Sequence, residues 1–335
     1  MTKVKIDKEN KDMNALAIHQ HLPTASQIIC GCMGLGGGWD QQPINKTHYH
    51  QAQQFIETAL ATGINYFDHA DIYTFGKAEQ VFGQVLAEQP SLREQMIVQS
   101  KCAIRFDDDS GPKRYDFSNE WITKSVDGIL SRLGIEYLDV LQLHRPDPLM
   151  ELAELAECLT SLQTSGRVKH FGVSNMNHHQ IAYLQSALDM PIIANQIEIS
   201  LQQLGWLDHG VLAGNPAGEH GNFCAGTMEY SQLNGVQIQS WGSLAQGLFS
   251  GRDVSNQAEY IKQTAKLVAN LAEQYNTNAD AIALSWIMRH PANIQPIIGT
   301  TNPERIKRCA EASKVKLSRE DWYQLYVSAR GEELP

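Results

Sequence analysis

The sequence has few basic residues and no long apolar run, and these shortages exclude several classes of protein. Lysine and arginine number 27 against 37 acidic residues in a chain of 335, so the net charge is −10. A chain of this charge with no basic block is a poor candidate for binding nucleic acid or an anionic membrane surface. No stretch approaches the ~18 apolar residues of a membrane-spanning helix, and the polar first twenty residues do not resemble a signal peptide. We therefore expect a cytoplasmic protein.

Cysteine is also scarce, and its spacing is irregular. The six cysteines form no CxxC pair, whereas disulfide frameworks and zinc sites usually show a regular spacing. We expect reduced, mostly buried thiols. With 42 % hydrophobic and 19 % charged residues, the chain has ample material for a folded core. The cysteines are Cys30, Cys32, Cys102, Cys158, Cys224 and Cys309.

Short apolar segments alternate with longer amphipathic ones along the chain. Each short segment is apolar over most of its length, as expected for a strand buried on both faces of a parallel sheet. Sustained alternation of this kind is typical of an α/β fold of the (β/α)8 TIM-barrel type, with a doubly wound open sheet as the rival. The predicted strands are 27–32, 64–68, 96–101, 137–144, 169–173, 192–196, 236–241 and 294–298.

The longer segments show the periodicity of helices. Ser118 is a suitable N-cap and Gly134 a suitable end for one helix. Similar stripes predict helices that end near Gly166, near Tyr275 and before Pro291.

Two segments fall outside the strand–helix alternation. Residues 1–26 are expected to form an N-terminal extension. A hairpin that closes the bottom of the barrel is one form that this extension can take. Residues 27–335 predict a single barrel domain, because no change of composition marks a second one. Within it, the glycine-rich residues 202–232 predict a long irregular loop, a type that is usually functional or mobile.

Four polar side chains of different chemistry lie at or near the ends of three consecutive predicted strands. Asp68 ends the second strand and Tyr73 follows it, Lys101 ends the third strand, and His144 ends the fourth. In a barrel enzyme the catalytic groups lie at the C-terminal ends of the strands. Taken singly, Asp68 also suits a helix cap and Tyr73 an interfacial aromatic. Lys101 and Asp68 also suit a structural ion pair, and His144 a core histidine. Together they favour a site, because a lysine inside a barrel is costly unless it is paired, and Asp68 is the available partner.

This set of side chains suits proton donation to a carbonyl oxygen. The phenol of Tyr73 has an ordinary pKa of about 10, which is too high for an efficient acid at neutral pH. We expect the ammonium of Lys101 to lower that pKa, while Asp68 holds Lys101 in place. His144 can donate a hydrogen bond that orients the substrate oxygen. Carbonyl reduction needs a hydride that no amino acid supplies, so a nicotinamide cofactor is implied.

A metal site is the main alternative use of the histidines. His69 and Asp71 could be combined with His144, but no second histidine follows within three or four residues on one element. A metal would also leave the nearby lysine unexplained, so we predict no metal site. The consecutive pair His178 and His179 opens a predicted helix and is expected at the surface.

Seven motifs extend this interpretation over most of the chain. They are FDHADIYTFGKAE (67–79), QSKCAIR (99–105), LDVLQLHRPDP (138–148), RVKHFGVSN (167–175), ANQIE (194–198), SWGSLAQGLFSGR (240–252) and IIGTTNPERI (297–306). In order and spacing they resemble the aldo-keto reductases from about residue 27 to residue 321. Through HRPDPLM (144–150), the chain looks most similar to the bacterial monomeric-type oxidoreductases of that family.

The resemblance implies a role for each matching residue. Asp68, Tyr73, Lys101 and His144 would be the catalytic tetrad, with Tyr73 as the acid in reduction and the base in alcohol oxidation. The nicotinamide would contact Ser174, Asn175 and Gln196, and would stack on Trp241. The diphosphate would lie against the loop 242–252, through Gly242, Ser243, Leu244 and Gly247. The adenosine end would meet Gly299, Thr300, Asn302 and Arg305.

The adenosine segment also indicates which cofactor is used. Arg305 is placed to pair with a 2′-phosphate, which favours NADPH and NADP⁺. Gly299 departs from the resemblance, because many NADPH-dependent members have a lysine there, and NADH therefore stays open as a second cofactor. Lys307 and Arg308 could replace that charge, although consecutive helical residues cannot both face the ligand.

We therefore predict an NADP(H)-dependent oxidoreductase that reduces an aldehyde or ketone to an alcohol. Its partner is a small-molecule carbonyl substrate, with no nucleic acid, membrane or obligate protein partner. Trp39, Phe75 and Phe223 predict apolar surface in the pocket. The same barrel serves as the β-subunit of potassium channels, so a cofactor-binding regulatory subunit with little turnover is the alternative. A metal-dependent barrel hydrolase is a third, less favoured one.

Overall fold

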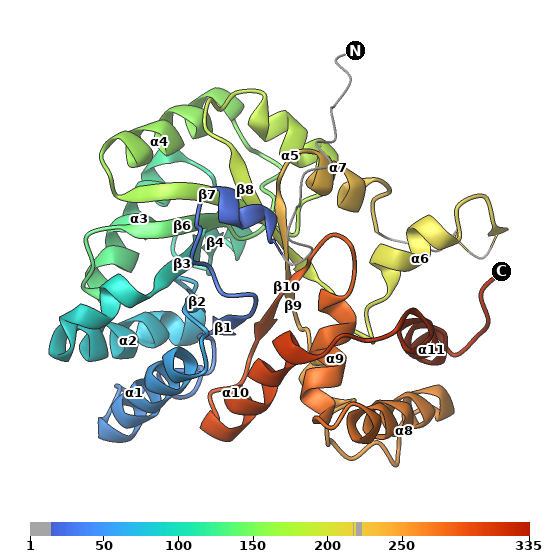
Figure 1. Cartoon of the computed structure of the whole chain (residues 1–335). Coiled ribbons are helices and arrows are strands. Elements are labelled where there is room, and N and C mark those ends of the chain that lie inside the picture. Colours follow the sequence, from blue (N-terminus) through green and yellow to red (C-terminus); the bar gives the residue numbers. More distant parts are fainter. Residues whose placement is uncertain (1–14, 217, 219–222) are drawn as a thin grey trace.

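The computed structural model describes residues 15–216, 218 and 223–335, and its strands close into a barrel (Figure 1). The parallel strands pair in the order β1-β10-β9-β8-β7-β6-β3-β2, and β1 pairs with both β10 and β2. Each strand overlaps one predicted segment. The (β/α)8 barrel is therefore confirmed, and closure excludes the open sheet. The barrel strands are β1 (Ile29–Gly31), β2 (Tyr66–Asp68), β3 (Ile97–Cys102), β6 (Leu138–Leu143), β7 (Val168–Ser174), β8 (Ile192–Glu198), β9 (Gln237–Trp241) and β10 (Gln295–Ile298).

Helices cover the outside of the barrel, and a small hairpin of β4 (Ile104–Arg105) and β5 (Arg114–Tyr115) follows β3. Ser118 caps α3 by accepting a hydrogen bond from Trp121 N, and Gly134 ends it at φ 64°, as predicted. The helices are α1 (Lys46–Ala61), α2 (Lys77–Glu88), α3 (Asn119–Leu133), α4 (Leu152–Thr164), α5 (His178–Gln185), α6 (Gly205–Val211), α7 (Thr227–Leu233), α8 (Glu259–Gln274), α9 (Ala279–Met288), α10 (Pro303–Ala310) and α11 (Arg319–Arg330).

The interior of the barrel has an apolar layer at the N-terminal end of the strands and a polar layer beyond it. The polar layer consists of glutamines that are at most 3 % exposed, and it separates the apolar layer from the site described below. The apolar layer contains Ile29, Tyr66, Ile97, Val140, Ile193, Ala194 and Ile297.

The N-terminal extension closes the apolar end of the barrel. Leu16, Ile18, Leu22 and Ala25 pack on the apolar layer, and Ala17–Gln20 form a turn of 3₁₀ helix. Residues 15–26 contain no strand, and residues 1–14 of the expected hairpin lie outside the described residues.

The segment 202–232 is more regular than expected where the structure describes it. It contains α6 and most of α7, and α6 is tied to the C-terminal helix α11. Tyr326 donates to Asp208 at 2.5 Å, and Arg330 pairs with Asp208 at 3.3 Å. The prediction of a wholly irregular loop is therefore wrong for these residues, because buried Trp206 in α6 and buried Leu204 just before it pack on the core.

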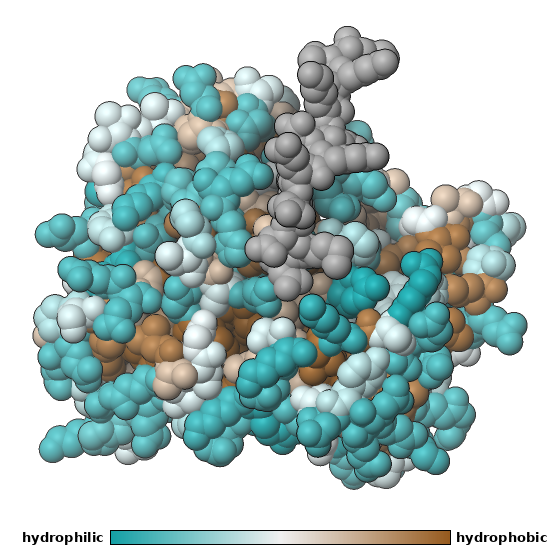
Figure 2. Space-filling view, in the orientation of Figure 1, coloured by the Kyte–Doolittle hydropathy of each residue, from teal (hydrophilic) through white to brown (hydrophobic). Residues whose placement is uncertain are grey.

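Hydrophilic side chains cover most of the face shown in Figure 2, and apolar ones appear mainly between them. Among the residues that the structure describes, no helix combines the length and the apolar character needed to cross a membrane.

Candidate active site

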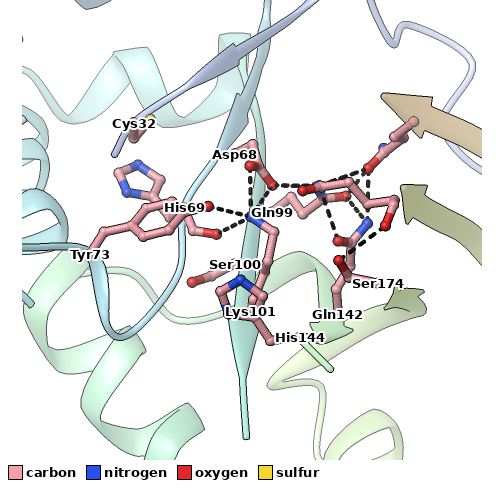
Figure 3. A network of polar contacts seen from close by, with 12 residues as sticks. Cys32, Asp68, His69, Tyr73, Gln99, Ser100, Lys101, Gln142, His144 and Ser174 are labelled. Atoms are coloured by element: carbon pink, nitrogen blue, oxygen red, sulfur yellow. Dashed lines mark hydrogen bonds and ion pairs between the residues drawn. The ribbon is translucent and has the colours of Figure 1, made fainter. Parts of the chain in front are cut away.

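The centre of the site is a buried ion pair between two neighbouring strands. Lys101 on β3 donates through Nζ to both carboxylate oxygens of Asp68 at the end of β2, at 2.7 and 2.6 Å (Figure 3). The side chains of Lys101 and Asp68 are 0 % and 3 % exposed. Lys101 Nζ also donates to the carbonyl oxygen of His69 at 2.9 Å and to Tyr73 Oη at 3.0 Å. One ammonium thus joins the carboxylate to the phenol, and little water reaches it.

A strained turn places Tyr73 beside this ion pair. Thr74 and Phe75 follow it with φ values of 47° and 60°, a left-handed conformation that such side chains rarely adopt. Each residue of this kind costs on the order of 1 kcal/mol or more. Buried Thr74 donates through Oγ1 to the carbonyl oxygen of Leu35 at 3.0 Å and so holds the turn. The irregular backbone at Thr74 and Phe75 therefore separates Tyr73 from the regular helix α2, which begins at Lys77.

Burial and charge act in opposite directions on these two groups. Burial raises the pKa of Tyr73 above its ordinary 10.0, and Lys101 lowers it without outweighing burial. The expected lowering of the Tyr73 pKa considered the ammonium but not the loss of water around the phenol. Burial alone would lower the pKa of Lys101, but attraction to Asp68 and Tyr73 raises it overall. At neutral pH, Tyr73 therefore holds its proton and Lys101 its charge.

His144 lies immediately after β6, with its ring edge-on to Tyr73 at 6.2 Å between centroids. Burial, followed by the positive charges of Lys101, Arg145 and Lys113, holds the pKa of His144 well below 6.5. Its buried Nδ1 has no hydrogen-bond partner among the described residues. The imidazole is thus neutral at physiological pH and free to take the tautomer that donates to a ligand.

A layer of glutamines lies beside the ion pair, to its right in Figure 3. Gln99 and Gln196 donate through Nε2 to the same oxygen of Asp68, at 2.6 and 3.2 Å. Gln142 donates to Gln239 at 2.8 Å and to Gln99 at 3.1 Å, which joins the layer into one network. The sequence analysis missed Gln99, Gln142 and Gln239. The available signal was an amide at inward-facing positions of otherwise apolar strands.

The residues expected around the nicotinamide lie together at the ends of β7, β8 and β9. Trp241 donates through Nε1 to Asn175 Oδ1 at 3.1 Å, and Asn175 donates through Nδ2 to Ser174 Oγ at 2.7 Å. These bonds fix the indole and present a half-buried flat ring, as a stacking partner requires. Gln196 differs from the expectation, because its amide donates downward into the glutamine layer and to Asp68.

The loop after β9, where a diphosphate was expected, is built of tight turns. The amides of Ala245 and Gly247 donate within this loop, to the carbonyl oxygens of Gly242 and Leu244. Gly242, Ala245, Gln246 and Gly247 all have positive φ, from 46° to 82°, and such turns arrange successive N–H groups into an anion-binding concavity. Leu244 is half-buried in this loop. Ser243 is buried, and its hydroxyl donates to Ser240 O at 2.7 Å, so its side chain is committed to the loop.

The segment expected to hold the adenosine end lies at the start of α10. Asn302 caps this helix by accepting from Glu304 N and Arg305 N, and Thr300 Oγ1 accepts from Asn302 N at 3.2 Å. A Cβ added at Gly299 would meet nothing within 4 Å. There is therefore open space around Gly299 for a longer side chain or a ligand.

A fully buried aspartate, which the sequence analysis did not identify, organises the arginines of α10. Asp280 pairs with Arg305 at 3.0 Å and with Arg308 at 2.8 Å. Two cations share one anion, so a net positive charge stays beside the open space. Lys307 and Arg308 were the two candidates to supply the charge that a lysine at position 299 would carry. Lys307 pairs with Glu304 at 2.7 Å. Arg308 shares Asp280 with Arg305, so Arg308 is the candidate on the same side as Arg305.

His69 is not arranged as a metal ligand. It is fully buried against Phe82, with ring centroids 4.6 Å apart, and neither ring nitrogen has a partner in the described part of the chain. Burial, followed by Lys101, lowers the pKa of His69 to about 3. Among the described residues, no cluster suited to a metal includes His69, Asp71 or His144.

These features fit a nicotinamide dinucleotide. The fixed indole of Trp241, the turns after β9, the open space at Gly299 and the paired arginines occur in this order along the chain, from the end of β9 to α10. Their chemistry matches an aromatic ring, a diphosphate and a terminal phosphate in that order.

Comparison with solved structures supports the same fold. A glycerol dehydrogenase from Gluconobacter oxydans superposes with a TM-score of 0.75 at 21 % identity, over 93 % of each chain. An aldo-keto reductase from Bacillus halodurans superposes with a TM-score of 0.70 at 22 % identity, over 91 % of this chain and 92 % of that one.

Comparison of sequences shows the family as well as the fold. A 6-dehydroglucose reductase from Agrobacterium fabrum (strain C58) is 34 % identical, over 92 % of this chain and 96 % of the relative. An oxidoreductase of Escherichia coli (strain K12) is also 34 % identical, over 85 % and 89 %. The model of the aldo/keto reductase family matches residues 27–327, which include every strand of the barrel. The chain belongs to the aldo/keto reductase family.

Proposed function

We propose that the protein reduces an aldehyde or ketone with NADPH, and that Tyr73 donates the proton. The observation that carries the proposal is the 3.0 Å hydrogen bond between Lys101 Nζ and Tyr73 Oη, with Asp68 on the other side of the ammonium. Proton donation leaves a phenolate, which burial alone would destabilise. The fixed charge of Lys101 offsets that cost at the moment the negative charge develops.

Asp68 and His144 have supporting parts in this proposal. Asp68 keeps Lys101 charged and in place, and Gln99 in turn positions Asp68. His144 is neutral and edge-on to Tyr73, so it can donate a second hydrogen bond to the carbonyl oxygen. Two donors on one oxygen both orient the substrate and polarise its carbonyl bond.

The cofactor would supply the hydride that the side chains cannot. Ser174, Asn175 and Trp241 would hold the nicotinamide, and the turns at Gly242 and Ala245–Gly247 would hold the diphosphate. We infer a preference for NADPH, since Arg305 and Arg308 share only one carboxylate and retain a net charge for a 2′-phosphate.

The substrate class that we propose is an aldehyde or ketone on an oxidised sugar or a molecule of similar size. Relatives from Agrobacterium fabrum and Novosphingobium aromaticivorans are named 6-dehydroglucose reductase, at 34 % and 36 % identity. Trp39, Phe75 and Phe106 form an aromatic row with centroids 5.6 and 5.4 Å apart, beside the turn that carries Tyr73. Aromatic faces suit the C–H faces of a sugar as well as apolar rings. Phe223 instead packs on the core cluster that contains Trp206, and it makes no ring contact with this row.

Transfer of deuterium tests the reaction itself. The protein would be incubated with NADPH deuterated at nicotinamide C4 and with either an oxidised sugar or an aromatic aldehyde. We expect an alcohol that carries the deuterium on the former carbonyl carbon. Retained nucleotide without any alcohol would overturn the proposal and favour the regulatory alternative. We place the reaction in the cytoplasm, where the six unpaired cysteines would stay reduced.

A further inference from the structure

We propose that His178, His179 and Cys224 form a binding site for a divalent transition metal of the Zn²⁺ type. Their ligand atoms all lie within 4.8 Å of one another. The two histidines begin α5, and Cys224 lies in the segment 202–232, just before α7, which runs beside α5 (Figure 1). The site is separate from the residues assigned to catalysis and to the cofactor.

The spacing of the ligand atoms suits a tetrahedral ion. Cys224 Sγ lies 3.7 Å from His178 Nδ1, and the rings of His178 and His179 are 3.9 Å apart between centroids. With Zn–S of about 2.3 Å and Zn–N of about 2.0 Å, neighbouring sulfur and nitrogen ligands of a tetrahedral zinc lie about 3.5 Å apart. The three atoms would thus supply three of the four ligands of one ion, and water the fourth. Two imidazoles and one thiolate are the ligands that zinc prefers.

The protein backbone holds these ligands close without a metal. Asn177 caps α5 in a reciprocal pair with Gln180, which fixes the first turn that carries both histidines. Buried Thr227 donates through Oγ1 to the carbonyl oxygen of Cys224 at 2.9 Å. Gly226, at φ 79°, turns the chain between Cys224 and α7. Folding of the chain therefore already brings the three residues together.

The contacts that His178 would give up on binding a metal are weak. The contacts of His178 Nδ1 are long, 3.4 Å to Thr227 Oγ1 and 3.7 Å to Cys224 Sγ, so neither is a strong hydrogen bond. Glu229 in the first turn of α7 adds a negative charge near His178. A bound ion would join two segments of the chain that are 46 residues apart.

Cobalt and zinc titrations of the full, untagged protein test the proposal. Co²⁺ should produce a thiolate-to-metal charge-transfer band and the visible bands of a tetrahedral ion, and one equivalent of Zn²⁺ should remove both. Cys224→Ser should abolish the charge-transfer band. His179→Ala changes an exposed side chain and should weaken Zn²⁺ binding at least about tenfold.

His209→Ala is the matched control, because His209 lies on α6 of the same segment 202–232 and belongs to no metal-binding cluster among the described residues. It should bind Zn²⁺ as the wild type does. Hydrogen exchange at the start of α7 should slow when Zn²⁺ is added to the wild type but not to Cys224→Ser. Equal affinity in the wild type and in Cys224→Ser, or the absence of any charge-transfer band, would overturn the proposal.

Discussion

Replacement of Lys101 by methionine removes the charge at the centre of the site. The side chain is fully buried, and its ammonium contacts both oxygens of Asp68, His69 O and Tyr73 Oη. Methionine has a similar length but leaves the carboxylate of Asp68 buried with only glutamine amides as donors. Removing one partner of a buried ion pair in this way costs about 3–5 kcal/mol of unfolding free energy.

A second substitution separates this cause from a general loss of packing. Asp68→Asn in the Lys101→Met background removes the orphaned charge and should restore part of the lost stability. Urea unfolding followed by tryptophan fluorescence measures both changes. The exposed pair Lys307–Glu304 provides the control, since Lys307→Met should cost less than about 1 kcal/mol. A similarly small loss for Lys101→Met, or a further loss when Asp68→Asn is added, would refute the account of the buried pair.

Three further predictions concern the cofactor, pH and the glutamine layer. Gly299→Lys should raise the ratio of kcat/KM for NADPH over NADH about fivefold, because one extra ion pair in solvent contributes up to about 1 kcal/mol. An unchanged ratio would mean that the 2′-phosphate binds elsewhere. Burial, and after it the negative charge of Glu79, raises the pKa of Asp71 from 3.8 to about 7. The folded state therefore binds the carboxyl proton of Asp71 more tightly than the unfolded state does. The free energy of unfolding should fall as the pH rises from about 4 to about 7. Asp71→Asn should therefore gain stability relative to the wild type between pH 4 and pH 8, on the order of 1 kcal/mol or more, and equal pH dependence in urea unfolding would contradict this. Gln99→Met should lower kcat about tenfold by releasing Asp68, whereas Gln295→Met, which alters the layer without contacting Asp68, should change stability but not kcat.

The sequence predicted the fold because each barrel strand carries its own signal. Strands buried on both faces keep a majority or half of their residues apolar, so β3 and β6 could be found from residue type despite their inward-facing polar side chains, and helix α3 from its two caps. It also predicted that Asp68 and Lys101 pair, since a lysine at a strand end inside a barrel needs a counter-ion.

Contacts between distant segments could not be predicted in the same way. The pairing of Asp280 with Arg305, and of Cys224 with His178, depends on how whole helices and loops pack. The direction of the Tyr73 pKa depends on how much water burial removes, which no spacing in the sequence reports. The glutamine layer needed the register of four strands before its members could be recognised as neighbours.

The most direct test of the central claim is the rate of a single turnover in Tyr73→Phe. This change removes only the hydroxyl that accepts a hydrogen bond from Lys101. NADPH binding, measured by quenching of tryptophan fluorescence, should stay close to that of the wild type, and Tyr115→Phe on the exposed hairpin should behave as the wild type throughout. We predict that oxidation of bound NADPH by an aromatic aldehyde slows at least about a hundredfold in Tyr73→Phe, the usual contribution of a general acid. Turnover at the wild-type rate would show that the proton comes from another group.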